Sequence, residues 1–180
     1  MTTHKTPYEM VAEFHEIFDP RKPAQPTAFD GKEALFRAGF KVEELVEFLF
    51  AASGGERRHF DELVAGLHEA VDQAQSKVLK KMEPVSDPLV AQTDALTDLL
   101  YLTYGSFALM GVDPQPIMAI VHEANMGKLF PDGQPHYDPI TNKVMKPANW
   151  AEAFAPEAKI KKELQRQTQA AQPQRLTEER

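Results

Sequence analysis

DALTDLLYLTYGSFALM, residues 94–110, combines a nearly unbroken apolar surface with two acids one helical turn apart. At about 100° per residue, Asp94 and Asp98 share one stripe of a helix with Leu102. The other side chains leave almost no polar face, which is typical of a helix at the centre of a fold. We therefore expect a central helix whose two carboxylates point toward the core.

A second acid-bearing segment, KVEELVEFLF at residues 41–50, repeats this combination. Glu44 and Glu47 lie close to one helical stripe, Glu43 precedes them, and Phe, Leu and Val surround all three. An EExxE run is most often a solvated helix face, but these apolar neighbours favour a buried cluster. Buried like charges persist only if they are protonated, paired with cations or bound to metal. Hard divalent cations accept carboxylate oxygens, so the acids predict a phosphate-processing Mg²⁺ site.

Composition sets the class of protein. A chain of 180 residues with 42% hydrophobic residues suits one globular domain. It has no cysteine, which excludes thiolate zinc sites, and its net charge of −7 argues against a nucleic-acid partner. No stretch approaches the ~20 apolar residues of a membrane span, and the N-terminus has no hydrophobic signal core. We expect no membrane partner and a cytoplasmic location.

Helical periodicity and breakers divide the chain into elements. Three prolines interrupt residues 19–31, and Asp87 precedes Pro88 as a capping residue. No strand candidate exceeds a few residues, so the fold class is all-α, a compact bundle of four to five helices. The expected helices cover residues 8–18, 31–52, 56–82, 88–110 and 114–128.

From Phe130 the chain changes character. FPDGQPHYDPITNKVMKPANW, residues 130–150, mixes turn-forming residues with lysines and the lone tryptophan, which predicts an ordered, functional loop. Beyond Pro156 the sequence is rich in Lys, Gln and Glu, which predicts a solvated helix fraying into a disordered tail. We expect one domain over residues 1–155 and a solvated or flexible tail over 156–180.

The segment VHEANMGKL, residues 121–129, places Asn125 and Lys128 within one helical turn. Taken singly, Lys128 suits the negative end of a helix dipole, and Lys143 and Lys146 are ordinary solvated lysines. Taken together, they supply the donors that a triphosphate needs opposite a metal cluster.

Four segments, in this order and spacing, resemble the all-α nucleoside triphosphate pyrophosphohydrolases of the MazG-like and phosphoribosyl-ATP pyrophosphohydrolase-like superfamily. Within it, the chain is similar to small single-domain, dUTPase-like members. The likeness covers residues 8–150 and is carried by EELVE (43–47), DALTDLLYLTYG (94–105), VHEANMGKL (121–129) and NKVMKPANW (142–150). It implies Mg²⁺-dependent hydrolysis of a (deoxy)nucleoside triphosphate to the monophosphate and pyrophosphate, by attack of water on the α-phosphorus.

The resemblance also assigns roles to the acids. Glu44 and Glu47 match metal-binding acids, Glu43 matches an auxiliary acid, and Asp98 matches the acid that ends the family's ExxD. The chain departs from this motif, because its second carboxylate is Asp94, four residues before Asp98. Residues four apart share a helix face, so Asp94 is also expected to bind metal, while the number of ions stays open.

The remaining roles follow from the same resemblance. Asn125 and Lys128 match positions around the sugar and phosphates, and residues 142–150, with Lys143 and Lys146, look like a lid. The resemblance implies two or more Mg²⁺ ions, for which Mn²⁺ would substitute. It also implies that Glu43 or Glu47 accepts the proton of the attacking water and that Lys128 is a catalytic cation. Related proteins are dimers or dimers of dimers, and the apolar stripe of the helix over residues 56–82 offers a surface for a homodimer.

Two alternatives remain. A carboxylate-bridged di-iron or di-manganese bundle requires two Glu-x-x-His pairs, and the chain has one such spacing, from Glu56 to His59. A non-catalytic helical interaction module would use the acids to pair with a basic partner.

Overall fold

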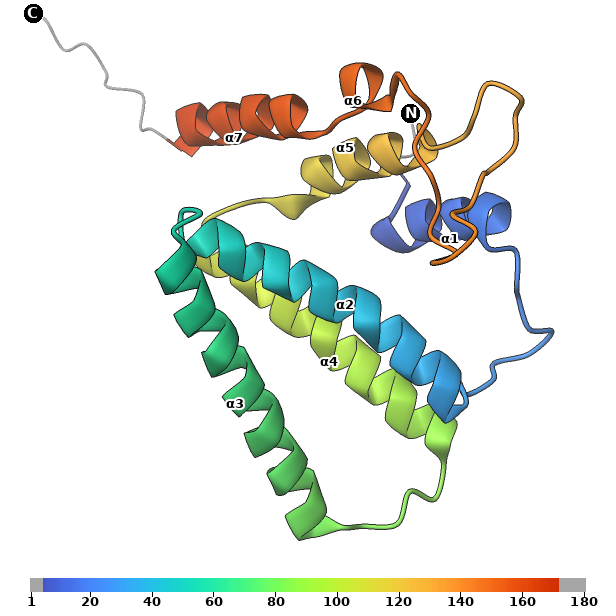
Figure 1. Ribbon diagram of the computed structural model, residues 1–180, viewed down its shortest axis with the longest axis vertical. Helices are drawn as coiled ribbons and strands as arrows, with labels where there is room; N and C mark the ends of the chain where they lie inside the picture. The colour runs from blue at the N-terminus through green and yellow to red at the C-terminus, as the bar shows by residue number, and fades with distance from the viewer. Residues whose placement is uncertain (1–4, 172–180) are drawn as a thin grey trace, which may run out of the picture. The chain divides into compact units, whose positions relative to one another are not determined.

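The computed structural model describes residues 5–171, and their regular structure is helical (Figure 1). The β-pairing found among residues 5–171 is an isolated antiparallel bridge between Tyr137 and Val144. The predicted all-α class is confirmed, and the first five helices match their expected bounds within two residues. The helices of the described residues are α1 (Pro7–Phe18), α2 (Gly31–Ala52), α3 (Arg57–Lys81), α4 (Pro88–Leu109), α5 (Pro114–Met126), α6 (Trp150–Ala153) and α7 (Glu157–Ala171).

Side-chain caps fix where these helices begin. Thr6 caps α1 in a capping box, in which the Glu9 N–H donates to the Thr6 hydroxyl and the Glu9 carboxylate accepts from the Thr6 N–H. The predicted cap of α4 is also present, because Asp87 Oδ1 accepts from the N–H groups of Leu89 at 2.9 Å and Val90 at 3.1 Å. Each cap satisfies N–H groups that have no partner inside the helix.

The chain divides into two compact units, and the boundary falls inside α4, between Leu96 and Thr97. Unit 2, residues 25–96, is built on the pair α2 and α3, which meet at a turn and then separate (Figure 1). Phe50 packs edge-on against Phe60 near this turn, with 5.2 Å between the ring centroids. Because the helices diverge from there, the later turns of α3 leave Val71 and Val78 exposed.

Unit 1 contains the described residues up to Ala24 and from Thr97 onward, and in it α5 packs against both α1 and α7. Its buried side chains include Met10, Phe18, Ile117 and Ala124. Where α1 meets α5, His122 Nε2 lies 2.9 Å from a Glu13 carboxylate oxygen. The ammonium of Lys5 and the imidazole of His122 both hold the pKa of Glu13 below its usual value.

Side-chain bonds attach helix α7 to the N-cap residue of α5 and to a residue in the last turn of α5. Gln167 accepts the N–H of Asp113 at 2.9 Å and donates to the Asp113 carbonyl at 3.0 Å. Lys159 Nζ lies 2.9 Å from a Glu123 carboxylate oxygen. Arg166 and Gln167 both donate to Glu163 and lower its pKa to about 2. The sequence predicted a helix in this region but not its packing on α5.

The domain boundary at residue 155 stays a prediction. The fraying end of the predicted tail, residues 172–180, lies outside the described residues.

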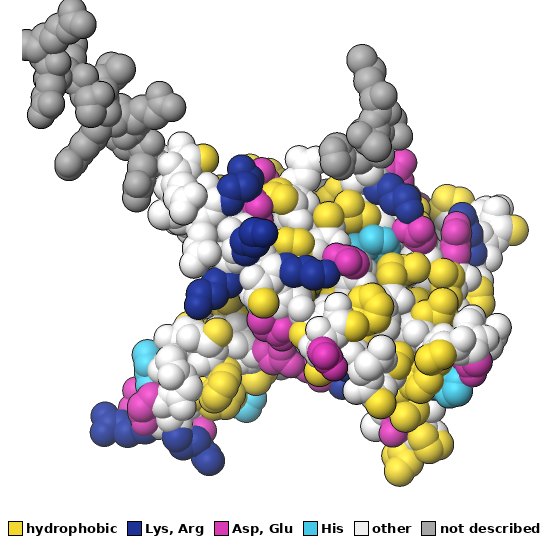
Figure 2. Space-filling model, turned by 90° about the horizontal axis from the view of Figure 1, so that it is seen from above, with side chains coloured by type: hydrophobic (Ala, Val, Ile, Leu, Met, Phe, Trp, Pro, Cys, Tyr) yellow, Lys and Arg dark blue, Asp and Glu magenta, His cyan; other side chains and the backbone are white. Residues whose placement is uncertain are grey.

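The expectation that residues 94–110 form a buried central helix is wrong for the single chain. Along α4, Leu99 is 47% exposed, Leu100 62% and Tyr101 76%. Figure 2 shows hydrophobic side chains gathered in patches between charged and other polar side chains. The physical reason is that this chain's own packing leaves apolar faces of α2, α3 and α4 accessible to solvent.

Among the described residues, no single helix has the length and apolarity to cross a membrane. By length and composition alone, α4 and α5 pass that test together, but they bend by 116° at their junction.

Candidate active site

Three of the predicted site acids, Glu43, Glu44 and Glu47, lie in the second half of α2, and all three are exposed. Their apolar neighbours are exposed as well, with Leu45 at 46% and Phe48 at 56%. The expectation that these acids are buried is therefore wrong for the single chain, because among residues 5–171 the packing leaves the face of α2 that carries them accessible to solvent.

The other two acids, Asp94 and Asp98, lie on α4, which continues without a break across the boundary of the two units. One helical turn separates them, so both carboxylates leave the same face of α4. Both residues are exposed. The segment from Asp94 to Asp98 is therefore regular α-helix. Ala95 stands where the family's ExxD has its Glu, and the second carboxylate is one residue earlier, at Asp94.

Within residues 5–171, no group of three or more acidic or histidine side chains is placed to hold a single metal ion. The convergence of Glu44, Glu47, Asp94 and Asp98 on Mg²⁺ therefore stays a prediction. The donor chemistry fits such an ion, since these side chains offer only carboxylate oxygens and the chain has no cysteine.

The predicted substrate donors Asn125 and Lys128 lie at the carboxyl end of α5, in unit 1. Both residues are half-buried. The Lys128 N–H donates to the Asn125 carbonyl at 3.1 Å, which tightens this last turn. The two residues therefore lie within one turn, and their roles toward the substrate stay predictions.

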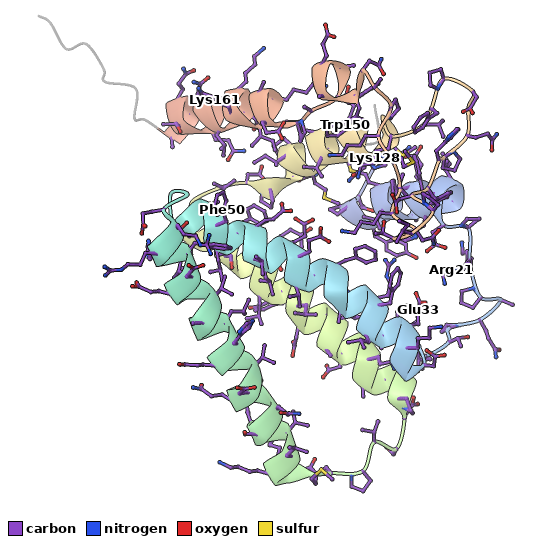
Figure 3. The ribbon with its side chains drawn as sticks, in the orientation of Figure 1. Arg21, Glu33, Phe50, Lys128, Trp150 and Lys161 are labelled. Atoms are coloured by element: carbon purple, nitrogen blue, oxygen red, sulfur yellow. The ribbon has the colours of Figure 1, made fainter. Side chains whose placement is uncertain are left out.

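Two aromatic side chains pack on the carboxyl end of α5: Trp150, the first residue of α6, and Phe154, which directly follows α6. The Trp150 indole N–H donates to the Ala124 carbonyl at 2.8 Å. The Phe154 ring lies so close to Gly127 that a Cβ atom there would stand 2.3 Å from the ring's Cγ. Figure 3 labels Trp150 and Lys128 at this end of α5. The Trp150 and Phe154 rings therefore pack the segment that follows the 130–150 loop against the turn that carries Lys128.

Of the two predicted lid lysines, Lys146 is placed by an aromatic ring, with its Nζ 4.0 Å from the centroid of the Trp150 ring. Lys143 is exposed, and its backbone carbonyl accepts the N–H of Asp138 at 2.8 Å. The structure therefore assigns a fixed neighbour to the Lys146 ammonium.

The loop that carries both lysines is ordered, as predicted. Asp138 accepts the Thr141 N–H at 2.7 Å, the Thr141 hydroxyl at 2.9 Å and the Ile140 N–H at 3.0 Å, and these bonds lower the pKa of its carboxyl. The Tyr137 hydroxyl donates to the Phe18 carbonyl at the end of α1 at 2.8 Å. The loop is thus tied both internally and to α1.

Sequence reasoning missed the roles of Trp150, Phe154 and Gly127. A signal was present, since the lone tryptophan follows Lys146 by four residues in a segment that turns into helix. Nothing in the sequence shows that this ring reaches back to Ala124, a contact over 26 residues.

The structure also bears on the di-metal alternative. The Glu56 carboxylate caps α3, accepting the N–H groups of Arg58 at 2.9 Å and His59 at 2.7 Å. The chain's only Glu-x-x-His pair thus has a local structural use.

Comparison with known structures gives the class of the protein. The chain is similar to a solved crystal structure described as a "putative NTP pyrophosphohydrolase" from Exiguobacterium sp. 255-15. The two are 38% identical with a TM-score of 0.82, over 93% of this chain and 99% of the other. No match was found among curated proteins. The fold is thus that of an all-α protein of the pyrophosphohydrolase class, as the sequence resemblance implied.

The family follows from the sequence. Residues 11–125 match the family described as phosphoribosyl-ATP pyrophosphohydrolase, and the chain belongs to this family. The match spans all five acids and ends at Asn125. The chain is therefore a pyrophosphohydrolase enzyme, and the two alternative classes drawn from its sequence are set aside.

Proposed function

We propose that the enzyme hydrolyses a (deoxy)nucleoside triphosphate, dUTP or another dNTP, to the monophosphate and pyrophosphate. The observation that carries this proposal is the acid set on α2 and α4, because the family match covers all of it and every member is exposed to solvent. Carboxylates alone repel a triphosphate, so accessible acids suit a substrate that binds together with divalent cations. Water attacks the α-phosphorus, and the bond between that phosphorus and the bridging oxygen to the β-phosphorus breaks.

Glu44, Glu47, Asp94 and Asp98 are the proposed ligands of Mg²⁺, for which Mn²⁺ substitutes. When bound, Mg²⁺ supplies an activated water and neutralises charge on the phosphates. The protein's own carboxylates perform the proton transfer, with Glu43 or Glu47 accepting the proton of the attacking water.

The cationic half of the proposal lies on unit 1. Lys128, together with Lys143 and Lys146, stabilises the negative charge that develops on the departing pyrophosphate. Asn125, within one turn of Lys128, donates to the sugar or phosphates. The fixed end of α5 supports these roles, since preorganised donors need no rearrangement when charge develops.

We further propose that the enzyme acts as a homodimer or a dimer of dimers. Contiguous apolar surface exposed on a single chain marks an interaction site when it extends over several turns. On α3, Val71 and Val78 are 58% and 68% exposed, and on one stripe of α2 Leu35 and Val42 are 75% and 49% exposed. A second copy that covers these faces would bury them without any change of fold. A cytoplasmic location remains part of the proposal.

The reaction is tested by supplying each common dNTP and NTP with Mg²⁺ in ¹⁸O-labelled water and identifying the products. Attack at the α-phosphorus is expected to give labelled monophosphate and unlabelled pyrophosphate, because the β,γ unit is the leaving group. Orthophosphate with a nucleoside diphosphate would instead show attack at the γ-phosphorus and would overturn the proposed reaction. The same screen identifies the preferred base and sugar.

A further inference from the structure

The Trp150 side chain joins two features that the proposed reaction uses separately. Its ring face carries the Lys146 ammonium at 4.0 Å from the centroid, well inside the ~6 Å range of a cation–π contact. Its indole N–H, 2.8 Å from the Ala124 carbonyl, fixes the same ring to the last turn of α5. One rigid side chain thus connects a loop lysine to the turn that carries Asn125 and Lys128.

The attachment of the ring follows from how α5 ends. In a continuing α-helix the Lys128 N–H would donate to the Ala124 carbonyl, but here it donates to the Asn125 carbonyl at 3.1 Å. The indole N–H supplies the donor that the Ala124 carbonyl would otherwise receive from the helix. Four residues later, Phe154 lies directly on Gly127, which further restricts α6 and therefore the Trp150 ring.

We propose that Trp150 is a positioning residue, which holds the Lys146 ammonium beside the carboxyl end of α5 in readiness for the polyphosphate of the substrate. This inference rests on the proposed function, in which Lys146 binds phosphate. An ammonium has three N–H donors, and a ring on one side of it leaves donors for phosphate oxygens. A long lysine side chain loses rotamer freedom when it binds a ligand, and a ring that already restricts it lowers that cost.

The test is a double-mutant cycle on the binding of inorganic tripolyphosphate and of α,β-imido-dUTP, measured by calorimetry. Lys146→Met is expected to weaken binding about tenfold, as loss of a charge-assisted phosphate contact does. Trp150→Leu is expected to weaken it about two- to fivefold, the range of an exposed cation–π contact. In the Lys146→Met background, Trp150→Leu should then have no further effect, because Trp150 acts through Lys146.

Two further variants separate positioning from general support of the fold. Trp150→Phe keeps a ring face but loses the indole N–H, so it should bind more tightly than Trp150→Leu. Lys161→Met, an exposed α7 lysine labelled in Figure 3, is the matched control and should bind as the unaltered protein does. Equal losses for Trp150→Leu in both backgrounds would overturn the proposal and leave the tryptophan a structural role.

The lone tryptophan offers a second readout that needs no variant of Trp150. Tripolyphosphate should change Trp150 emission in the unaltered protein and much less in Lys146→Met, since the ligand then no longer acts on a cation at the ring. An equal emission change in both proteins would also contradict the proposal. Failure of the proposed function looks different, because the unaltered protein would then bind neither probe and release no pyrophosphate.

Discussion

At the scale of single residues, Gly127 shows how closely the end of α5 is packed. A Cβ atom at this position would lie 2.3 Å from Phe154 Cγ, and Cγ is the inner atom of the ring rather than a flexible end. Gly127→Ala is therefore expected to destabilise the protein by about 1–3 kcal/mol, as overpacking of a filled space does. Urea unfolding followed by Trp150 fluorescence measures this loss.

The control for Gly127 is a glycine with open space around it. Gly66 lies inside α3, and no atom stands within 4 Å of where its Cβ would be. Gly66→Ala should stabilise the protein by about 0.5–1 kcal/mol, because alanine loses less backbone entropy in a helix. If both alanine variants were equally stable, the close contact of Phe154 with Gly127 would be wrong.

The site acids are also predicted residue by residue. Glu47→Gln and Asp98→Asn should each reduce turnover by orders of magnitude while leaving the fold intact, because both side chains are exposed. Asp94→Ala tests the four-residue spacing, and a mild effect would mean that fewer carboxylates hold the ions. Near-normal turnover in Glu47→Gln or Asp98→Asn would remove that residue from the site.

A thermal readout accompanies these three variants and does not depend on turnover. Ions bound only by the native acids stabilise the folded chain by mass action, so Mg²⁺ should raise Tm relative to EDTA. The increase should shrink in Glu47→Gln and Asp98→Asn. An equal Tm in Mg²⁺ and EDTA, with activity intact in EDTA, would contradict the metal assignment.

At the scale of elements, α7 contributes to unit 1 through its packing on α5. Gln167→Ala removes both bonds to the Asp113 backbone and is expected to destabilise the protein by about 1–2 kcal/mol. Gln165→Ala, an exposed neighbour on the same helix, is the matched control and carries the same change in helix propensity. Urea unfolding of the two variants should differ by that amount, and identical curves would show that the Gln167 bonds do not stabilise unit 1.

The helices were predictable because their signals are local. The three prolines before α2, the cap at Asp87 and the prolines at 88 and 114 each act within a few residues, and the observed bounds follow them. The packing of α7 was not predictable, because Gln167 meets Asp113 across 54 residues. A glutamine-rich helix has no apolar pattern from which such a contact could be predicted.

At the scale of the whole molecule, the sequence indicated the proposed acids but not their surroundings. The apolar neighbours of Glu44 and Asp98 predicted burial, yet the single chain leaves both acids exposed. An apolar helix face favours burial, but the sequence does not show whether the same chain or a second protein buries it. The exposed apolar faces of α2, α3 and α4 are the surfaces that the proposed homodimer would cover.

Self-association is expected to depend on the apolar stripe of α3. Val78, 68% exposed on the apolar stripe of α3, is replaced by lysine, which places a charge where a second copy is proposed to pack. Val78→Lys should shift the protein toward monomer, observed by sedimentation velocity over a range of concentrations. Ser76→Lys adds the same charge nearly on the opposite face of α3 and should leave the assembly unchanged. If Val78→Lys and Ser76→Lys sediment alike as dimers, α3 is not the interface, whereas a monomeric unaltered protein would contradict the proposed assembly altogether.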